Sequence, residues 1–261
     1  MPEHDLIVLP EQYGVEILRT EIGSTLHGIS IGNDDRDEMG VCIERPEHVI
    51  GLEPFEQFIY RTAAARESRH DAPSQSGDLD LTVYSLRKWS RLALKGNPTV
   101  LLLLFAPQSK LVVTTPLGTE LQKLAYAFVS REAGRAFLGY ISAQKSRYLR
   151  ERGTAGIPDR GDKDAKYLAH LLRLGYQGRE LMETGTITLP MPEGQRVRCV
   201  DARKGADPQD ILTEVGRLER ELKDLQDTAP LPAQPDRDTV NDFLIRAYQD
   251  VWSVVTEKKR H

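Results

Sequence analysis

The spacing of apolar residues changes along the chain and predicts two regions. In the first region, short apolar segments end at glycine, proline or acidic residues. Residues 39–43 are almost entirely apolar, and residues 79–83 alternate between apolar and polar, so both segments predict strands. Residues 84–96 have apolar side chains at helical spacing and predict a helix that ends at Gly96.

Two further segments of the first region also predict helices. Residues 15–18 suggest a short helix before a glycine–serine turn. Within residues 54–65, Phe55, Phe58 and Ile59 have helical spacing. Residues 97–105 are so apolar that we expect them to be buried.

The second region is mainly helical in pattern. Apolar residues recur every three or four positions over 118–150, 162–184, 208–226 and 239–255, and a β-like piece at 184–192 interrupts them. The repeat at 208–226 is too short for a coiled coil and predicts an amphipathic surface helix. The predicted fold class is therefore α+β, with a small mixed β-sheet and helices in residues 1–110 and a mainly helical domain in residues 111–261.

Composition and charge exclude several classes of protein. The chain has 39% hydrophobic and 28% charged residues, as globular proteins do. Its net charge of −4 argues against strong non-specific binding to nucleic acid. The two cysteines have no zinc or disulfide spacing. We find no signal-peptide pattern and no membrane-spanning apolar run, so we expect a cytoplasmic protein with no membrane partner.

Pairs of aspartates precede or begin both predicted strands. Asp35 and Asp37 are two positions apart, so in an extended chain their side chains project from the same face. Asp78 and Asp80 repeat this spacing. If the two strands are neighbours, Asp80 can join Asp35 and Asp37, and three carboxylates can hold two Mg²⁺ ions for phosphoryl displacement. The alternative is a solvated acidic turn.

A glycine–serine turn precedes the first aspartate pair. Gly23 allows a ligand to approach the backbone closely, and the N–H groups at the start of a following helix can bind phosphate. The Ser24 hydroxyl is a further donor. Alone, such a pair is usually only a turn. Beside the aspartates, it predicts a site in which one element holds a triphosphate and the other holds metal ions.

These motifs resemble the nucleotidyltransferase superfamily related to DNA polymerase β, and within it a bacterial and phage group of predicted nucleotidyltransferases. The resemblance covers roughly residues 20–220 and rests on GSTLHG, DDRDEMGVCIE, DLTVYSLRKWSRLALKGNPTVLLLLF and KYLAHLLRL with the later LMETG. It implies that Gly23 and Ser24 bind nucleotide phosphates and that Asp35 and Asp37 coordinate two Mg²⁺ ions. It also implies that Asp80 helps to activate the attacking hydroxyl.

Two positions leave the ligand set open. The superfamily usually has serine where this chain has Asp34, so Asp34 is an alternative to Asp35. Asp78 is likewise an alternative to Asp80. His27 lies beside the phosphate turn, but nucleotidyl transfer depends on metal ions and an aspartate more than on an imidazole, so we expect no catalytic role for it.

Residues 163–175 predict an amphipathic helix with a basic face. Lys166, His170 and Arg173 follow one another at spacings of four and three. They match positions in the resembling group, which implies that they line the cleft opposite the carboxylates and neutralise the triphosphate or the acceptor. The alternative is a solvated basic face. Tyr140 and Lys145, on the preceding predicted helix, are further candidates.

The predicted function is metal-dependent nucleotidyl transfer. The enzyme would move a nucleoside monophosphate from a nucleoside triphosphate (NTP) to an unknown acceptor, which could be an RNA end, a protein or a small molecule. Pyrophosphate would be released, and two Mg²⁺ ions would act as cofactors. One alternative is a non-catalytic nucleotide-binding regulatory module. The other is a metal-dependent phosphoester hydrolase, which would not need the glycine–serine turn.

Overall fold

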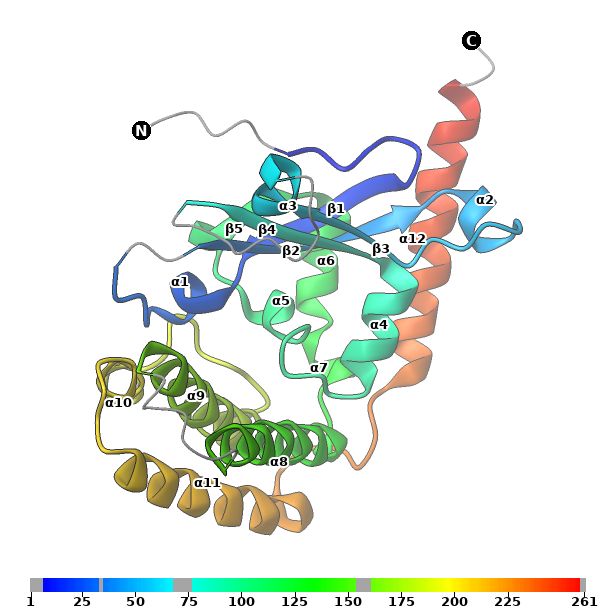
Figure 1. Ribbon diagram of the computed structural model, residues 1–261. Coiled ribbons are helices and arrows are strands. Elements are labelled where there is room, and N and C mark those ends of the chain that lie inside the picture. The colour runs from blue at the N-terminus through cyan, green and yellow to red at the C-terminus, as the bar shows by residue number, and fades with distance from the viewer. Residues whose placement is uncertain (1–6, 33–34, 68–76, 154–160, 259–261) are drawn as a thin grey trace.

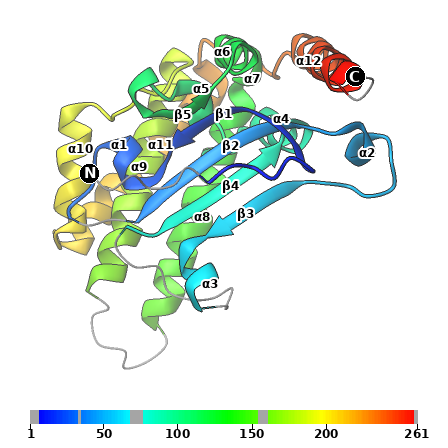
Figure 2. The same cartoon turned by 90° about the horizontal axis from the view of Figure 1, so that it is seen from above.

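A five-stranded mixed sheet lies at the centre of the N-terminal half. The computed structural model describes residues 7–32, 35–67, 77–153 and 161–258. The strands lie in the order β3-β4-β2-β1-β5, as Figure 2 shows. They are β1 (Gly14–Glu21), β2 (Arg36–Glu44), β3 (Gln57–Arg61), β4 (Leu79–Ser85) and β5 (Leu111–Thr114). Strands β2 and β4 are parallel, whereas β1 is antiparallel to β2 and β5, and β3 to β4.

Helices cover one face of the sheet, and a layer of longer helices lies beyond them (Figure 1). The shorter helical elements are α1 (Gly23–His27), α2 (Pro46–Val49), α3 (Thr62–Glu67), α4 (Leu86–Leu94), α5 (Leu102–Phe105), η1 (Gln108–Lys110), α6 (Pro116–Lys123) and α7 (Ala125–Phe128). The layer of longer helices consists of α8 (Arg131–Gly153), α9 (Asp162–Thr184), α10 (Glu193–Arg203) and α11 (Pro208–Thr228), and a further long helix is α12 (Arg237–Lys258). The predicted α+β fold class is confirmed.

The alternation of side chains on β2 and β4 determines which residues face the helices. Met39 and Val41 of β2 belong to the large core between sheet and helices. Leu81 and Val83 of β4 belong to a smaller cluster on the opposite face. Because successive side chains of a strand point to opposite faces, Asp37 and Asp80 both project from the helix-covered face.

Two helix predictions in the N-terminal region are wrong. Residues 15–18 lie within β1, where Ile17 and Leu18 are both buried in the large core between sheet and helices. The register between β1 and β2 shifts between Glu16 and Leu18, and such an irregularity breaks the alternation of side chains, so the apolar run resembled a helix turn. Residues 54–65 contain β3 and the start of α3, and Phe58 packs into the smaller cluster.

The predictions at 39–43, 79–83 and 84–96 are confirmed as β2, β4 and α4. Ser85 caps α4, since its hydroxyl accepts a hydrogen bond from the Lys88 N–H at 3.2 Å. Gly96 has a φ of +71°, which suits the residue that ends the helix.

Most of the C-terminal helices agree with the predicted segments. The segment 118–150 divides into α6, α7 and α8, and 162–184 and 208–226 correspond to α9 and α11. Helix α11 buries Ile211, Val215, Leu218 and Leu222 along one face. The β-like pattern at 184–192 is wrong: no strand forms there, and Ile187 and Met191 are buried as the chain crosses the core. Helix α10 was not predicted.

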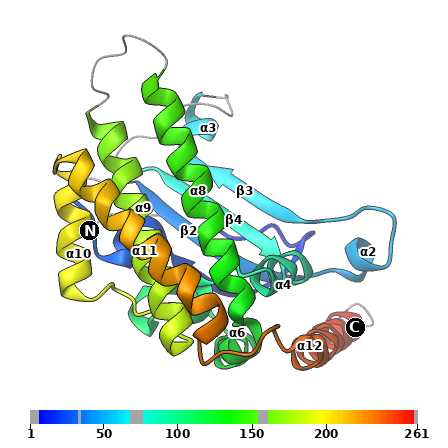
Figure 3. The same ribbon diagram turned by 90° about the horizontal axis from the view of Figure 1, so that it is seen from below.

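Helix α12 corresponds to the segment 239–255 and returns to the sheet, beside α4 and apart from the layer of α8 to α11 (Figure 3). The Tyr248 hydroxyl donates a hydrogen bond to the buried Glu44 carboxylate. The Trp252 indole N–H donates to the Glu44 backbone oxygen at 2.8 Å. Strand β5, which belongs to the sheet, and helix α12, which packs against it, both lie beyond residue 110. The domain boundary proposed at residue 110 stays a prediction. None of the helices in the described ranges is long and apolar enough to span a membrane.

Candidate active site

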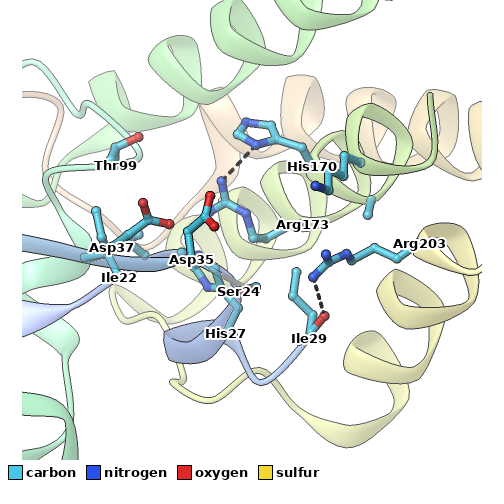
Figure 4. Close-up of a pocket in the computed structure, with 14 residues that line it drawn as sticks. Ile22, Ser24, His27, Ile29, Asp35, Asp37, Thr99, His170, Arg173 and Arg203 are labelled. Carbon is cyan, nitrogen blue, oxygen red and sulfur yellow. Dashed lines mark hydrogen bonds between the residues drawn. The ribbon is translucent and has the colours of Figure 1, made fainter. Parts of the chain in front are cut away.

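A cavity of about 360 Å³ lies between the start of β2, helix α1 and the helices α9 and α10. In Figure 4, Asp35 and Asp37 lie on one wall, and His170 and Arg173 of α9 form another. Seven of the eight residues predicted from the sequence line this cavity: Gly23, Ser24, Asp35, Asp37, Lys166, His170 and Arg173. Asp80 is not among its lining residues.

The glycine–serine turn connects β1 to α1 beside the aspartates. Gly23 has a φ of +68°, and a side chain at this position would collide with the Asp37 carboxylate. Glycine is therefore required both by the backbone and by the close approach of the carboxylate. The Ile22 N–H donates to the Asp37 backbone oxygen at 2.8 Å, which fixes the turn against β2. Ile22, at the N-cap, has no side-chain oxygen that could accept hydrogen bonds from the first N–H groups of α1.

Asp37 and Asp80 are directly paired in the register of the parallel strands β2 and β4. The condition stated from the sequence, that the two strands are neighbours, is met. The Asp80 carboxylate, however, accepts hydrogen bonds from the Arg61 Nε, which lies 3.2 Å from both Oδ1 and Oδ2. Arg61 is the last residue of β3, the strand on the other side of β4. Asp80 thus lies beside Asp37 but faces a guanidinium group.

The two alternative aspartates differ in what can be said of them. Asp78 is buried, and its carboxylate binds the Arg66 guanidinium at 2.8 and 3.3 Å. Asp34 lies outside the described residues. Carboxylate oxygens are ligands that Mg²⁺ prefers, so Asp35 and Asp37 fit this ion. Over the ranges that the structure describes, no group of three or more His, Cys, Asp or Glu side chains has a metal-binding arrangement.

Helix α9 forms the basic wall of the cavity. Arg173 is buried, and its Nη1 donates to the Gln177 Oε1 at 3.1 Å. Its Nη2 lies 3.3 Å from the His170 Nδ1. Among the described residues, no carboxylate forms an ion pair with Arg173, so a buried cation faces the cavity with neutral partners only.

Burial and the arginine charge keep the nearby histidines neutral. Burial, and then the Arg173 charge, lower the pKa of His170 to about 3. The same two causes, followed by the charge of His170, lower the pKa of His27 well below its ordinary value. Burial also lowers the pKa of Arg173 to about 10, so it remains a cation near neutral pH. Of the three side chains His27, His170 and Arg173, it is therefore Arg173 that carries the positive charge near neutral pH.

Several residues at the cavity were not predicted from the sequence. Thr99 lines it from the segment before α5, and Arg203 lines it from the end of α10. The Arg203 Nη1 donates to the Ile29 backbone oxygen at 3.0 Å. Periodicity gave no signal for either residue. The two further candidates are engaged elsewhere, since Tyr140 accepts a hydrogen bond from Asn97 and Lys145 pairs with Glu219.

Two of the solved structures that match this chain are distant likenesses. One is spectinomycin adenyltransferase AAD(9) from Enterococcus faecialis with ATP and spectinomycin. It has 13% identity and a TM-score of 0.41, covering 80% of this chain and 92% of that chain. The other is a nucleotidyltransferase-like protein from Exiguobacterium sibiricum 255-15, with 12% identity and a TM-score of 0.29, covering 83% and 70% of the two chains.

A search of curated proteins found no match. A protein family gives the decisive comparison. Its description is "RlaP: RNA repair pathway DNA polymerase beta family", and it matches residues 4–246, which is most of the chain. The resemblance to the polymerase β-like nucleotidyltransferase superfamily is therefore confirmed, and the chain belongs to the RlaP family of RNA repair pathway DNA polymerase beta proteins.

Proposed function

We propose that the protein is a Mg²⁺-dependent nucleotidyltransferase that transfers a nucleoside monophosphate from an NTP to an RNA end and releases pyrophosphate. One observation carries this proposal. A single cavity combines a glycine–serine turn, the carboxylates of Asp35 and Asp37, and the buried Arg173 cation without a carboxylate partner in the described residues. The family description, which names an RNA repair pathway, supports an RNA acceptor.

The basic wall supports binding of the triphosphate. A buried cation with only neutral partners is unfavourable without a counter-charge, and a phosphate oxygen would supply one. Arg173 can donate two parallel hydrogen bonds to such an oxygen pair, while Lys166 and Ser24 add donors from the same cavity. This chain would thereby orient the NTP and stabilise charge on the departing pyrophosphate.

Asp35 and Asp37 would hold the Mg²⁺. Protein sites for this ion commonly use one or two carboxylates together with substrate phosphates, so two carboxylates beside a triphosphate site suit it. When bound, Mg²⁺ neutralises phosphate charge and lowers the pKa of a bound hydroxyl. Gly23 has no side chain that would fill the space beside the Asp37 carboxylate. The phosphates could therefore approach this carboxylate closely enough for both to bind the same Mg²⁺.

Asp80 would accept the proton of the attacking hydroxyl. Its position beside Asp37 in the sheet supports this role. Since Arg61 binds both of its carboxylate oxygens, Asp80 must exchange at least one of these hydrogen bonds before it can act as a base.

The same pair supports a second candidate function. If Arg61 holds Asp80 permanently, the protein would bind an NTP without transferring it and would serve as a nucleotide-responsive module. The Arg61–Asp80 pair is the observation that favours this alternative.

Incubation with each α-³²P-labelled NTP, Mg²⁺ and short RNAs would test the proposal. The RNAs should carry 3′-hydroxyl, 3′-phosphate, 2′,3′-cyclic phosphate or 5′-phosphate ends. We expect label on one class of end and stoichiometric pyrophosphate. The variant carrying D35N and D37N should lose at least about 10²–10³-fold in rate. Asp210→Asn, an exposed change on α11, is the matched control and should act as wild type.

Two results would contradict the proposal. Bound NTP that is recovered intact with every RNA would favour the module. Undiminished label transfer by the D35N and D37N variant would show that these carboxylates are not part of the reaction.

A further inference from the structure

Gln177 lies at the junction of α9 and α1, immediately behind the cavity. It is one helical turn beyond Arg173, it is only 1% exposed, and it is not among the residues that line the cavity. A glutamine so deeply buried must satisfy its amide within the protein. Its two partners are Arg173 on α9 and His27 on α1.

The chemistry of the partners fixes the direction of both hydrogen bonds. Arginine can only donate, so the Gln177 oxygen must face the Arg173 Nη1, 3.1 Å away. The Gln177 NH₂ group must then donate to the His27 Nδ1, also at 3.1 Å. His27 therefore accepts at Nδ1 and carries its proton on Nε2. The orientation of the amide thus follows from the arginine.

The two bonds connect elements that the proposed function uses together. His27 ends α1, the helix that begins with Gly23 and Ser24. Arg173 is the buried cation of the opposite wall. The Gln177 amide thus joins the helix that begins with Gly23 and Ser24 to the Arg173 guanidinium. If the amide were flipped, both hydrogen bonds would be lost.

We propose that Gln177 is a positioning residue, which orients the Arg173 guanidinium toward the cavity and ties it, through His27, to the helix that carries Gly23 and Ser24. The proposal rests on the proposed function, since the oriented guanidinium would bind the triphosphate. Gln177 itself does not touch the nucleotide.

Gln177→Met removes both hydrogen bonds while keeping the length of the side chain. We expect the Kd for a non-hydrolysable NTP analogue with Mg²⁺ to rise about 10-fold, and KM for NTP to rise more than kcat falls. Gln122→Met is the matched control. The Gln122 amide donates to the Leu103 and Ala106 oxygens at 3.0 and 3.1 Å, and none of these three residues lines the cavity. This variant should lose stability but keep wild-type nucleotide affinity. Equal affinities of Q177M and wild type would overturn the proposal.

Imidazole ¹⁵N chemical shifts of the wild-type protein give a second readout, which needs no variant and no turnover. They should show His27 protonated on Nε2 and not on Nδ1. In Gln177→Glu, both side-chain oxygens are acceptors, so the His27 proton should move to Nδ1. A wild-type His27 that carries its proton on Nδ1 would overturn the proposal even if Q177M did not fold.

The two proposals fail in different ways. If wild type binds no NTP but the His27 chemical shifts are as expected, the proposed function is wrong. The hydrogen bonds of Gln177 would then join α9 to α1 without any role in binding a nucleotide. If wild type labels RNA and Q177M has an unchanged KM, the function stands and the positioning role is wrong.

Discussion

Two buried arginines, Arg19 and Arg173, have opposite surroundings. Arg19 is on β1 and is 1% exposed, and it binds the Glu16 carboxylate at 2.5 and 2.7 Å and the Glu38 carboxylate at 3.2 Å. Arg173 is 8% exposed, and its side-chain partners among the described residues are a glutamine and a histidine. Glu38 directly follows Asp37 on β2, so it projects from the opposite face of the sheet.

The pKa shifts of the two arginines express this difference. Burial alone would lower the pKa of Arg19, but the hydrogen bond and charge of Glu16, with the charge of Glu38, raise it. Burial lowers the pKa of Arg173 to about 10, and no carboxylate of the described residues is among the causes that shift it. We infer that Arg19 stabilises the fold through its ion pairs, and that the Arg173 guanidinium gains a negatively charged partner only when an anionic ligand is bound. Burial alone thus does not distinguish an arginine that stabilises the fold from one that binds a ligand, whereas the charge of its partners does.

The largest expected effect is on the framework side. Arg19→Met should lower the free energy of unfolding by about 3–5 kcal/mol, because Glu16 would remain buried without its cation and Glu38 would keep only its ion pair with Arg36. Urea denaturation measures this loss. Nucleotide affinity of the folded fraction should not change, and a selective loss of affinity would break the contrast between the two arginines.

The pair of Asp80 and Arg61 is a third case to set beside Arg19 and Arg173. Arg61 has a carboxylate partner, as Arg19 does, but it is only partly buried, with 30% of its side chain exposed. Asp80→Asn should reduce the rate of nucleotidyl transfer about 10²–10³-fold with little effect on stability. Asp78→Asn is the matched control, since Asp78 also pairs with an arginine, Arg66, but it is Asp80 that lies beside Asp37 in the strand register. A larger loss of rate with Asp78→Asn would show that Asp78 takes the role expected of Asp80.

On the cavity side, Arg173→Met should weaken binding of an NTP analogue about 10- to 100-fold. The free energy of unfolding should stay equal or rise, because the variant removes a buried charge that lacks a carboxylate partner in the described residues. Isothermal titration and urea denaturation of the same preparation separate the two quantities. A loss of stability as large as that of Arg19→Met would contradict the distinction.

The smallest expected effect is on pH dependence. His27 and His170 have folded pKa values below the ordinary 6.5, so below that pH the unfolded state binds protons that the folded state excludes. Stability should therefore fall as pH decreases, by about 1 kcal/mol for each histidine between pH 7 and 5.5. The raised pKa of Glu16, caused mainly by burial, acts in the opposite direction.

Comparison with His27→Gln and His170→Gln isolates the histidines from the carboxylates. The difference in unfolding free energy between pH 7 and 5.5 should be smaller in each variant than in wild type. Identical differences in wild type and variants would show that the two histidines are not held neutral by their surroundings.

Strand period and residue type were sufficient to predict the carboxylate side of the site. Asp35 and Asp37 share a face because side chains alternate along an extended chain, and Asp80 came from the assumption that two strands are neighbours, which their register confirms. The partner of Asp80 could not be predicted, because Arg61 lies in a segment whose aromatic spacing suggested a helix.

The other side of the site depends on packing between distant segments. Arg173 was found from its spacing along one helix, but the absence of a carboxylate partner in the described residues is a property of the three-dimensional structure. Gln177 carried no sequence signal, since its partner His27 is 150 positions away. Arg203 lies on α10, a largely polar helix whose few apolar residues form no clear stripe in the sequence.

The most direct test of the central claim is a crystal structure with a non-hydrolysable NTP and Mg²⁺. We predict metal density bound by Asp35 and Asp37, with the triphosphate between Gly23, Ser24 and the Arg173 guanidinium. A nucleotide bound elsewhere on the molecule, or a triphosphate in this cavity with no metal at the two carboxylates, would contradict it.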